Sequence, residues 1–340
     1  MKKNTVMTIV MVVLAFVVVG ALVLSLNDVI SSVFSGTAVG GGMTYQNAEK
    51  YTAGETVITD NVRNLDVDWI NGEVNLAYHS ENTIELRETS NKEISPELEM
   101  RWWIDGDTLR IRFAKNGFKT SNLKQEKKLT ITLPVGIVFG KVSIDVTSAT
   151  VNIPALQADS LYLDATSGNL NAEGSVKEAE AGTTSGRIAL KMLAEEMDKI
   201  QAEATSGSIE IEAQHAKKIN VSTTSGAIGI TAQQAENCDV SATSGRILVN
   251  IGAADEVSIS TTSGAVDVTL GAFKKLDVGV TSGNVTLTLP QKPGFTAEIE
   301  TTSGDIEYSM PLSKQDDSYV CGDGSGKVSV AATSGDVLLK

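Results

Sequence analysis

Residues 205–245, TSGSIEIEAQHAKKINVSTTSGAIGITAQQAENCDVSATSG, hold two consecutive copies of a 19-residue repeat that begins with Thr-Ser-Gly. A degenerate copy, Thr-Ser-Ala, begins at Thr147, and five of the nine intervals that follow it are 19 residues long. The last interval, from 302 to 333, has 31 residues. A constant period of this length is typical of solenoids, in which similar units stack on one another. The complete copies begin at Thr166, Thr184, Thr205, Thr224, Thr243, Thr262, Thr281, Thr302 and Thr333.

Apolar side chains alternate within each repeat. Pairs such as Ile209 and Ile211 follow the threonine by four and six residues, and pairs such as Ile219 and Val221 follow it by fourteen and sixteen. Alternation with a period of two indicates a strand with one buried face, so each repeat is predicted to form two short strands joined by turns. Because the apolar columns recur at constant spacing, the coils are expected to stack in register. The predicted fold is all-β, a parallel β-solenoid (β-helix) of about nine coils over residues 147–340.

The glycine of each motif is assigned to a structural corner of the coil. Glycine suits a bend that needs a positive φ or a backbone without a side chain, and the neighbouring hydroxyls can bond the backbone of the corner. Eleven residues after the threonine a small residue recurs, as at Ala216, Ala235 and Ala254, which indicates a second tight corner. The assigned corner glycines are Gly168, Gly186, Gly207, Gly226, Gly245, Gly264, Gly283, Gly304 and Gly335.

Residues 60–146 alternate like strands without the 19-residue period, and they are predicted to form the N-terminal β cap that an open solenoid end requires. Asn71-Gly72 and Asp105-Gly106 are expected to form hairpin-like turns. The sequence LTITLP at 129–134 recurs as VTLTLP at 285–290, and each precedes a Gly-containing turn, a strand and a Thr-Ser motif. The predicted strands are Leu65–Ile70, Glu73–Tyr78, Thr83–Glu88, Glu97–Ile104, Thr108–Phe113 and Lys128–Leu133.

The N-terminal residues 6–26, VMTIVMVVLAFVVVGALVLSL, are almost continuously apolar. A helix of about 21 residues spans roughly 31 Å, the thickness of the hydrocarbon core of a bilayer. Lys2 and Lys3 precede this run, so the positive-inside rule predicts a single-pass transmembrane signal-anchor in the cell membrane, with a cytoplasmic stub at 1–5 and an extracytoplasmic C-terminal domain. The alternative is a cleaved signal peptide. Residues 27–59 are expected to form a flexible tether.

The chain beyond residue 26 is strongly acidic. When Lys2 and Lys3 are set aside, 26 basic and 42 acidic residues remain, a net charge of −16. Such a surface disfavours nucleic acid and, on average, anionic lipid. One basic stretch, residues 110–128, is a candidate contact with anionic lipid headgroups or an anionic cell-wall polymer, and the alternative is a solvated loop that balances nearby acids. Its basic residues are Arg110, Arg112, Lys115, Lys119, Lys124, Lys127 and Lys128.

The sequence contains no recognisable catalytic constellation. Two histidines, His79 and His215, are too few for a histidine-based triad or a His-rich metal site, and no metal or cofactor is predicted. The positions five residues after each motif threonine point outward. The acids among them are scattered rather than paired on adjacent coils, so an enzyme is not expected. Cys238 and Cys321 are expected to be unpaired thiols, since a disulfide would require the 31-residue coil to fold back.

The strand with Gly72-Glu73-Val74, the Thr-Leu-Pro segments and the serial Thr-Ser-Gly coils together resemble the bacterial putative-adhesin family of unknown function, over roughly residues 60–340. The resemblance implies surface display and adhesion, an association of some members with envelope-stress responses, and no catalytic residues. The chain departs from the pattern at Ala149 and in the enlarged coil after Asp305, which puts regular stacking in doubt there.

These observations lead us to expect an adhesin-like binding or scaffold module in the bacterial cell envelope. The expected partners are the membrane and a cell-wall polymer, anionic lipid headgroups or another envelope protein, but not nucleic acid. One alternative is the ectodomain of an envelope-stress sensing or regulatory system, which would need a partner because a five-residue stub cannot signal. A more distant alternative is a glycan-active enzyme.

Overall fold

The computed structural model describes residues 43–119 and 125–340. These residues form no helix that is long and apolar enough to cross a membrane. The predicted transmembrane segment 6–26 and stub 1–5 lie outside them. The chain divides into two compact units, one of residues 1–49 and 116–123 and the other of 50–115 and 124–340. In the first unit, the Met43 amide donates to the Phe118 carbonyl, and the Gly117 amide donates to the Met43 carbonyl.

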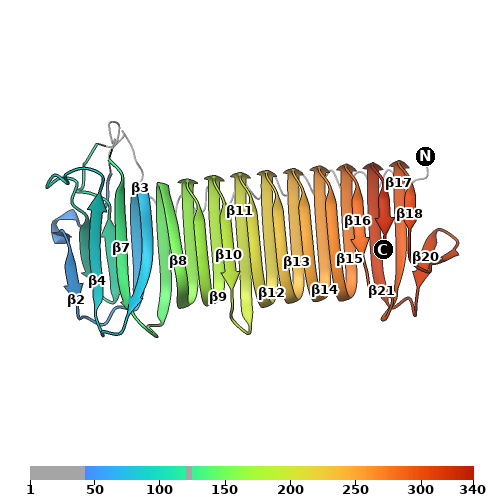
Figure 1. Ribbon diagram of the computed structural model, residues 1–340, viewed down its shortest axis with the longest axis horizontal. Coiled ribbons are helices and arrows are strands. Elements are labelled where there is room, and N and C mark those ends of the chain that lie inside the picture. Colours follow the sequence, from blue (N-terminus) through green and yellow to red (C-terminus); the bar gives the residue numbers. More distant parts are fainter. Residues whose placement is uncertain (1–42, 120–124) are drawn as a thin grey trace. The chain divides into compact units, whose positions relative to one another are not determined.

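The second unit is all-β, and its middle coils stack in register. β12 (Ile209–Ser225), β13 (Ile228–Ser244), β14 (Ile247–Ser263) and β15 (Val266–Ser282) pair in parallel, each residue with the one 19 positions later. Figure 1 shows these strands side by side in a row. The predicted parallel β-solenoid is therefore confirmed. Each of these coils has one 17-residue strand that passes through its bends, instead of the two short strands expected, and the strand stops only at the glycine corner.

The preceding coils follow the same plan with one interruption. β8 (Phe139–Ser167) pairs with β9 (Leu170–Ser185), and the next coil is split into β10 (Ile188–Met192) and β11 (Met197–Ser206). This repeat is 21 residues long, and residues 193–196 leave the ladder. Because β10 and β11 both pair onward with β12, the stack continues across the interruption.

The stack begins before the first Thr-Ser motif. β3 (Asn64–His79) is itself a coil, with one edge paired in parallel to β8 and the other to β6 (Thr108–Arg112) and β7 (Lys127–Pro134). Gly72 faces Ala149 and has a φ of 89°, so it occupies the corner position of this coil. The hairpin expected at Asn71-Gly72 is therefore wrong. The corner bends the chain within one rung of the stack instead of reversing it.

Antiparallel strands cover the N-terminal end of the stack. β4 (Ile84–Ser90) pairs with β7, and β5 (Arg101–Asp105) pairs with β6 through a turn at Gly106, which confirms the hairpin predicted there. β1 (Thr52–Ala53) and β2 (Thr56–Ile58) extend this layer by pairing with β5 and β4. A short 3-10 helix, η1 (Ala48–Lys50), precedes β1. Strands β1 and β2 fall in the region expected as a tether, and the structure assigns them to the cap instead.

At the C-terminal end the chain passes over one rung and later returns to fill it. β16 (Val285–Thr288) pairs with β15, but its continuation, β17 (Phe295–Ser303) with β18 (Ile306–Tyr308), lies one rung further along. The last strands, β21 (Gly326–Ser334) and β22 (Val337–Leu339), fill the rung between and pair in parallel on both sides. Stacking after residue 305 is therefore regular, although the rungs no longer follow chain order.

The same kind of connection occurs at both ends. β7 leads to β8 past the rung of β3, and β16 leads to β17 past the rung of β21. In both, four residues separate Leu-Pro from a phenylalanine, in LPVGIVF at 133–139 and LPQKPGF at 289–295. Both phenylalanine side chains are buried. The repeated Thr-Leu-Pro sequence thus marks the two places where the chain passes over a rung.

A hairpin of β19 (Ser313–Gln315) and β20 (Ser318–Cys321) joins β18 to β21, and β20 pairs antiparallel with the start of β17. Inside the coils, Ile, Val, Leu and Ala side chains form the core. Cys238 stacks in this core between Ile219 and Val257, and Cys321 lies opposite Phe295. Both cysteines are buried and free, and burial raises the pKa of the Cys238 thiol to about 12.

The corner glycines form one column in which successive backbones nearly touch. Gly245 has a φ of 131°, and a Cβ atom built there would overlap the carbonyl group of Gly226 in the preceding coil. A Cβ atom would overlap the neighbouring backbone at each of the nine assigned corners, from Gly168 to Gly335. The corner prediction is confirmed, and the close approach of the coils excludes a side chain even where φ alone would allow one.

Candidate functional site

The positions five residues after each motif threonine form a column on the outer surface of the coils, and we call it the outer strip. Its first members are joined, because the Asn152 side-chain amide donates to Asn75 Oδ1 at 2.9 Å and that of Asn171 donates to Asn152 Oδ1 at 3.0 Å. The parallel register therefore places polar groups one rung apart, about 4.8 Å. In spatial order the outer strip contains Asn75, Asn152, Asn171, Ala189, Glu210, Gly229, Leu248 and Asp267.

The outer strip has a hollow where small residues occur. A Cβ atom at Gly229 would meet open space, and the depression of about 330 Å³ around it is bordered by Arg187, Glu210 and Leu248. Arg187 and Glu210 form an ion pair, and Leu248 is 47% exposed. The hollow thus offers an apolar side chain beside a few polar groups, all held by paired strands. Such an arrangement suits ligand binding.

The motif threonine and serine form a second outward column. The serines are exposed and stack in register, as Ser225, Ser244 and Ser263 do, and the threonines Thr224 and Thr243 are exposed beside them. A threonine often precedes the motif and points the other way: Thr223 and Thr261 are buried, and their hydroxyls have no hydrogen-bond partner within the described residues. The solenoid therefore presents one row of hydroxyl groups to solvent and keeps another inside.

The predicted basic contact does not form one surface. Arg112 is buried and binds Asp66 through two hydrogen bonds of 2.9 and 3.1 Å, and Arg110 pairs with the same carboxylate. Lys128 pairs with Glu73 at 3.1 Å. The inclusion of Arg112 and Lys127 in a surface contact is therefore wrong, because both side chains are buried against acidic partners, Asp66 and Glu88. Lys115 and Lys119 are exposed, and Lys124 lies outside the described residues.

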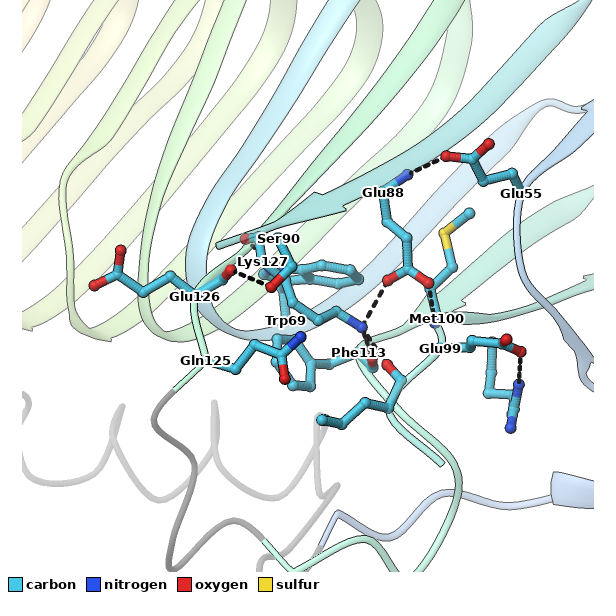
Figure 2. A network of polar contacts seen from close by, with 12 residues as sticks. Glu55, Trp69, Glu88, Ser90, Glu99, Met100, Phe113, Gln125, Glu126 and Lys127 are labelled. Carbon is cyan, nitrogen blue, oxygen red and sulfur yellow. Dashed lines mark hydrogen bonds and ion pairs between the residues drawn. The ribbon is translucent and has the colours of Figure 1, made fainter. Parts of the chain in front are cut away.

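Lys127 is the centre of a buried polar network at the N-terminal end of the stack. Figure 2 shows its ammonium group between Glu88, whose Oε2 lies 2.7 Å away, and the rings of Trp69 and Phe113. Lys127 Nζ also donates to the carbonyl groups of Leu98 and Phe113. Burial lowers the pKa of Lys127, and the Glu88 carboxylate opposes that shift. Because the Lys127 ammonium has the Glu88 carboxylate and two carbonyl groups as partners, it can lie buried in the core where the coils end.

A ladder of carboxyl groups, the acidic ladder, lies beside Arg112 on another face of the first coils. Asp68 pairs with Asp145 in the next rung, and Asp164 follows Asp145 by 19 residues. Burial and the neighbouring carboxylates of Asp164 and Asp68 raise the pKa of Asp145 to about 7. Burial raises the pKa of Asp164 to about 6. Stacked carboxyl groups that titrate near neutral pH are typical of functional sites, although structural clusters shift in the same way.

The sequence analysis missed the acidic ladder because it considered only the position five residues after the motif threonine. The acidic ladder lies two residues before that threonine, where Asp145 and Asp164 are one repeat apart. Asp68 could not be aligned with them, since β3 carries no Thr-Ser motif. Acids paired on adjacent rungs therefore exist at this position, whereas the acids five residues after the threonine, such as Glu210 and Asp267, are scattered as expected.

Most surface lysines of the coils pair with an acid of the preceding rung. Lys274 lies 2.8 Å from Asp255, and Lys275 lies 2.6 Å from Glu256, each 19 residues earlier. The same arrangement joins Lys217 to Asp198, Lys199 to Glu180, Lys191 to Glu173 and Lys177 to Asp159. Such exposed pairs contribute little to stability, because solvent screens them. Because these lysines are paired with acids, the remaining unpaired acids determine the surface charge.

The two histidines lie in different surroundings. His79 ends β3 and lies near Glu81 and Glu85, and these three are the one group among the described residues whose atoms are close enough to hold a metal ion. His215 lies in β12. Its Nδ1 atom lies 2.8 Å from the carbonyl oxygen of Glu195.

Three solved structures match this chain at low sequence identity. A "putative adhesin" of Parabacteroides merdae is 16% identical with a TM-score of 0.45, and the match covers 84% of this chain and 96% of that one. A "putative adhesin" of Parabacteroides distasonis is 15% identical with a TM-score of 0.47, covering 85% and 97%. A "putative lipid binding protein" of Parabacteroides distasonis is 12% identical with a TM-score of 0.35, covering 86% and 97%. No curated protein matches the sequence.

One protein-family model, described as Toastrack DUF4097, matches residues 62–340. The match begins just before β3, the first coil in the sequence, and extends to the last residue. It includes both places where the chain passes over a rung and every Thr-Ser-Gly motif. The resemblance noted in the sequence is confirmed, and this chain belongs to the Toastrack DUF4097 family.

Proposed function

We propose that this protein is a membrane-anchored, extracytoplasmic scaffold of the bacterial cell envelope, and that its outer strip binds an extended polymer. Residues 6–26 would anchor it, with the N-terminus in the cytoplasm. The observation that carries the proposal is the hollow at Gly229, which lies in a strip of uniform spacing and is bordered by Glu210 and the exposed Leu248. Solenoids commonly bind ligands on such extended, regular surfaces.

The ligand that fits the outer strip best is a neutral, hydroxyl-rich polymer such as the glycan of a cell wall. Asparagine amides and the Glu210 carboxylate can hydrogen-bond to hydroxyl groups, and Leu248 can contact an apolar sugar face. An anionic polymer fits less well, because the coil lysines are paired with acids and the net charge beyond residue 26 is −16. Binding rather than catalysis is proposed, since the hollow and the acidic ladder are lined by different residues.

The test is sedimentation of the full-length protein in detergent with purified cell wall, over a series of salt concentrations. Gly229→Trp fills the hollow from the solvent side and is expected to weaken binding at least tenfold, about 1.4 kcal/mol, with the melting temperature unchanged. Ser258→Trp places the same side chain on an outward position of β14 beyond the hollow, and it should bind like the unmodified protein. Equal binding by both variants would exclude the outer strip. Binding that high salt abolishes in both would favour the exposed lysines.

A second candidate function, the ectodomain of a sensing or regulatory system, is favoured by the C-terminal edge of the stack. β20 covers the outer edge of β17 only from Phe295 to Glu298. Among the described strands, none pairs with the outer edge of the rest of β17 or of β18. Such an edge can accept a strand from a partner protein. A photo-crosslinker at Glu307 that captures one membrane protein, where the same group at Glu236 in a middle coil captures none, would support this function over the first.

A further inference from the structure

His79, Glu81 and Glu85 converge at the connection between β3 and β4. His79 is the last residue of β3, the chain reverses over residues 80–83, and Glu85 is the second residue of β4. Each side chain offers one ligand atom, and these atoms all lie within 4.8 Å of one another. β7 pairs with both strands, through Pro134 opposite His79 and Thr132 opposite Glu85, so the three side chains meet across β7.

The imidazole of His79 is oriented by a group outside the cluster. Its Nε2 atom lies 2.6 Å from the carbonyl oxygen of Thr83. A carbonyl oxygen only accepts, so Nε2 carries the hydrogen, and Nδ1 holds the lone pair of the neutral ring. A hydrogen bond from the second ring nitrogen to a backbone carbonyl is the usual support of a metal-ligating histidine, because it fixes both tautomer and ring orientation.

The two carboxylates are only weakly neutralised. Arg87 approaches Glu85 at 3.8 Å, but this arginine is 69% exposed. Within the described part of the chain, no cationic group lies within ion-pairing distance of Glu81. Two carboxylates this close repel each other, and a bound cation would offset that repulsion.

We propose that His79, Glu81 and Glu85 form a binding site for a divalent transition-metal ion of the Zn²⁺ type. One nitrogen and two carboxylate oxygens match the donors that zinc prefers, whereas calcium and magnesium favour oxygen donors alone. In the tetrahedral geometry of zinc, ligand atoms at about 2.1 Å from the ion lie about 3.4 Å apart, so movements of at most about 0.8 Å by each side chain complete the site. Three protein ligands leave at least one coordination position for water or for a donor from another molecule.

The site has a structural consequence and lies beside a hollow. A bound ion ties β3, a coil held between β7 and β8, to β4 of the antiparallel cap. The residues between its ligands, Asn82 and Thr83, line a hollow of about 630 Å³ together with Arg63 and Val135, which lies in the connection from β7 to β8. A ligand held in this hollow would lie beside the turn that carries the ion.

The test uses full-length protein in detergent, stripped with EDTA and titrated with zinc chloride. We expect one ion per chain by calorimetry, a rise in melting temperature, and nitrogen-15 imidazole signals that shift for His79 while those of His215 stay in place. These are the two histidines of the chain, so assignment needs only His79→Gln and His215→Gln. Glu81→Gln and His79→Gln should weaken binding at least tenfold, and His215→Gln should not change it.

Calcium chloride serves as the comparison and is expected to bind at least tenfold more weakly than zinc. Circular dichroism of each metal-free variant establishes that it is folded, so loss of binding can be assigned to loss of a ligand. The proposal is overturned if zinc at millimolar concentration does not bind, if His79→Gln binds as tightly as the unmodified protein, or if the signals of His215 respond instead.

Discussion

The middle coils and the two ends of the solenoid are built from similar strands but connected in different ways. From β12 to β15 each coil lies beside the one that precedes it in the chain. At the N-terminal end the first coil, β3, is held between β7 and β8, and at the C-terminal end β21 is held between β15 and β17. The first and the last coil in chain order therefore pair on both edges, whereas an outermost strand would pair on one. This arrangement protects the parts of a repeat stack that fray most easily.

The two ends also differ from each other. Four antiparallel strands and the buried Lys127–Glu88 pair close the N-terminal end. The C-terminal end has one hairpin, which covers only part of β17. We infer that the first end is built for stability, and that the second is the more open to partners.

Deleting residues 326–340 would break the C-terminal arrangement and should have the largest effect. The deletion removes the buried side chains of Val328, Val330 and Val337, each of which stabilises by about 1.5–3 kcal/mol, and it empties a rung. Hydrogen exchange measured by mass spectrometry should show lost amide protection in β15–β18. Protection should persist in β8–β11, because coils depend on their nearest neighbours. Uniform loss along the whole stack would contradict this local dependence.

Gly245→Val tests the regular middle coils. We expect it to lower the free energy of unfolding by about 4 kcal/mol or more, because the new Cβ overlaps the backbone of Gly226 and the φ of 131° is strained for valine. Gly229→Val is the matched control, since a Cβ there meets open space, and its effect should be below about 1 kcal/mol. Equal melting temperatures for the two variants would contradict the close approach of the coils at the corner.

Lys127→Met tests the closure of the N-terminal end. It leaves the Glu88 carboxylate buried without its partner and should cost about 3 kcal/mol in chemical denaturation. The double variant with Glu88→Leu should recover most of that loss, because it removes both buried charges. Lys274→Met breaks an exposed pair with Asp255 and should change stability by less than about 1 kcal/mol. If the double variant is no more stable than Lys127→Met, the charge pair is not the cause.

The acidic ladder should give the smallest effect and a pH dependence. Folding raises the pKa of Asp145 from 3.8 to about 7, so the folded state holds this proton more tightly than the unfolded chain does. This contribution to stability is complete below about pH 4 and is lost as pH rises through about 7. Asp145→Asn should therefore raise the free energy of unfolding by about 1–2 kcal/mol at pH 8, with partial solvent exposure taken into account, and change it little at pH 4.

The matched control for that titration is Asp255→Asn, which changes an exposed carboxylate and should leave the pH dependence of unmodified protein in place. An identical pH dependence in Asp145→Asn and the unmodified protein would show that Asp145 titrates normally. The measurement is a series of denaturation curves from pH 4 to pH 8.

Two features of the ends could be read only in part from the sequence. The repeated Thr-Leu-Pro segments were visible, but their meaning, a connection that passes over a rung, required the pairing of β3 and β21. The basic residues of 110–128 suggested a surface, yet Arg112 binds Asp66 and Lys127 binds Glu88, partners 46 and 39 positions away in the chain. Charge counted along a sequence cannot show which charges are buried against a partner.

The sequence by itself determined the all-β class, the 19-residue coil, the inward columns and the glycine corners of this protein. Each of these follows from interactions that recur at one fixed spacing, so every copy of the repeat reports the same constraint. Only the tertiary structure decided the order of the rungs at the ends, the burial of Lys127, the pairing of Asp68 with Asp145 and the meeting of His79 with Glu85. These depend on single contacts between strands that occur once, across β7 or beside β3, and a contact made once leaves no period in the sequence.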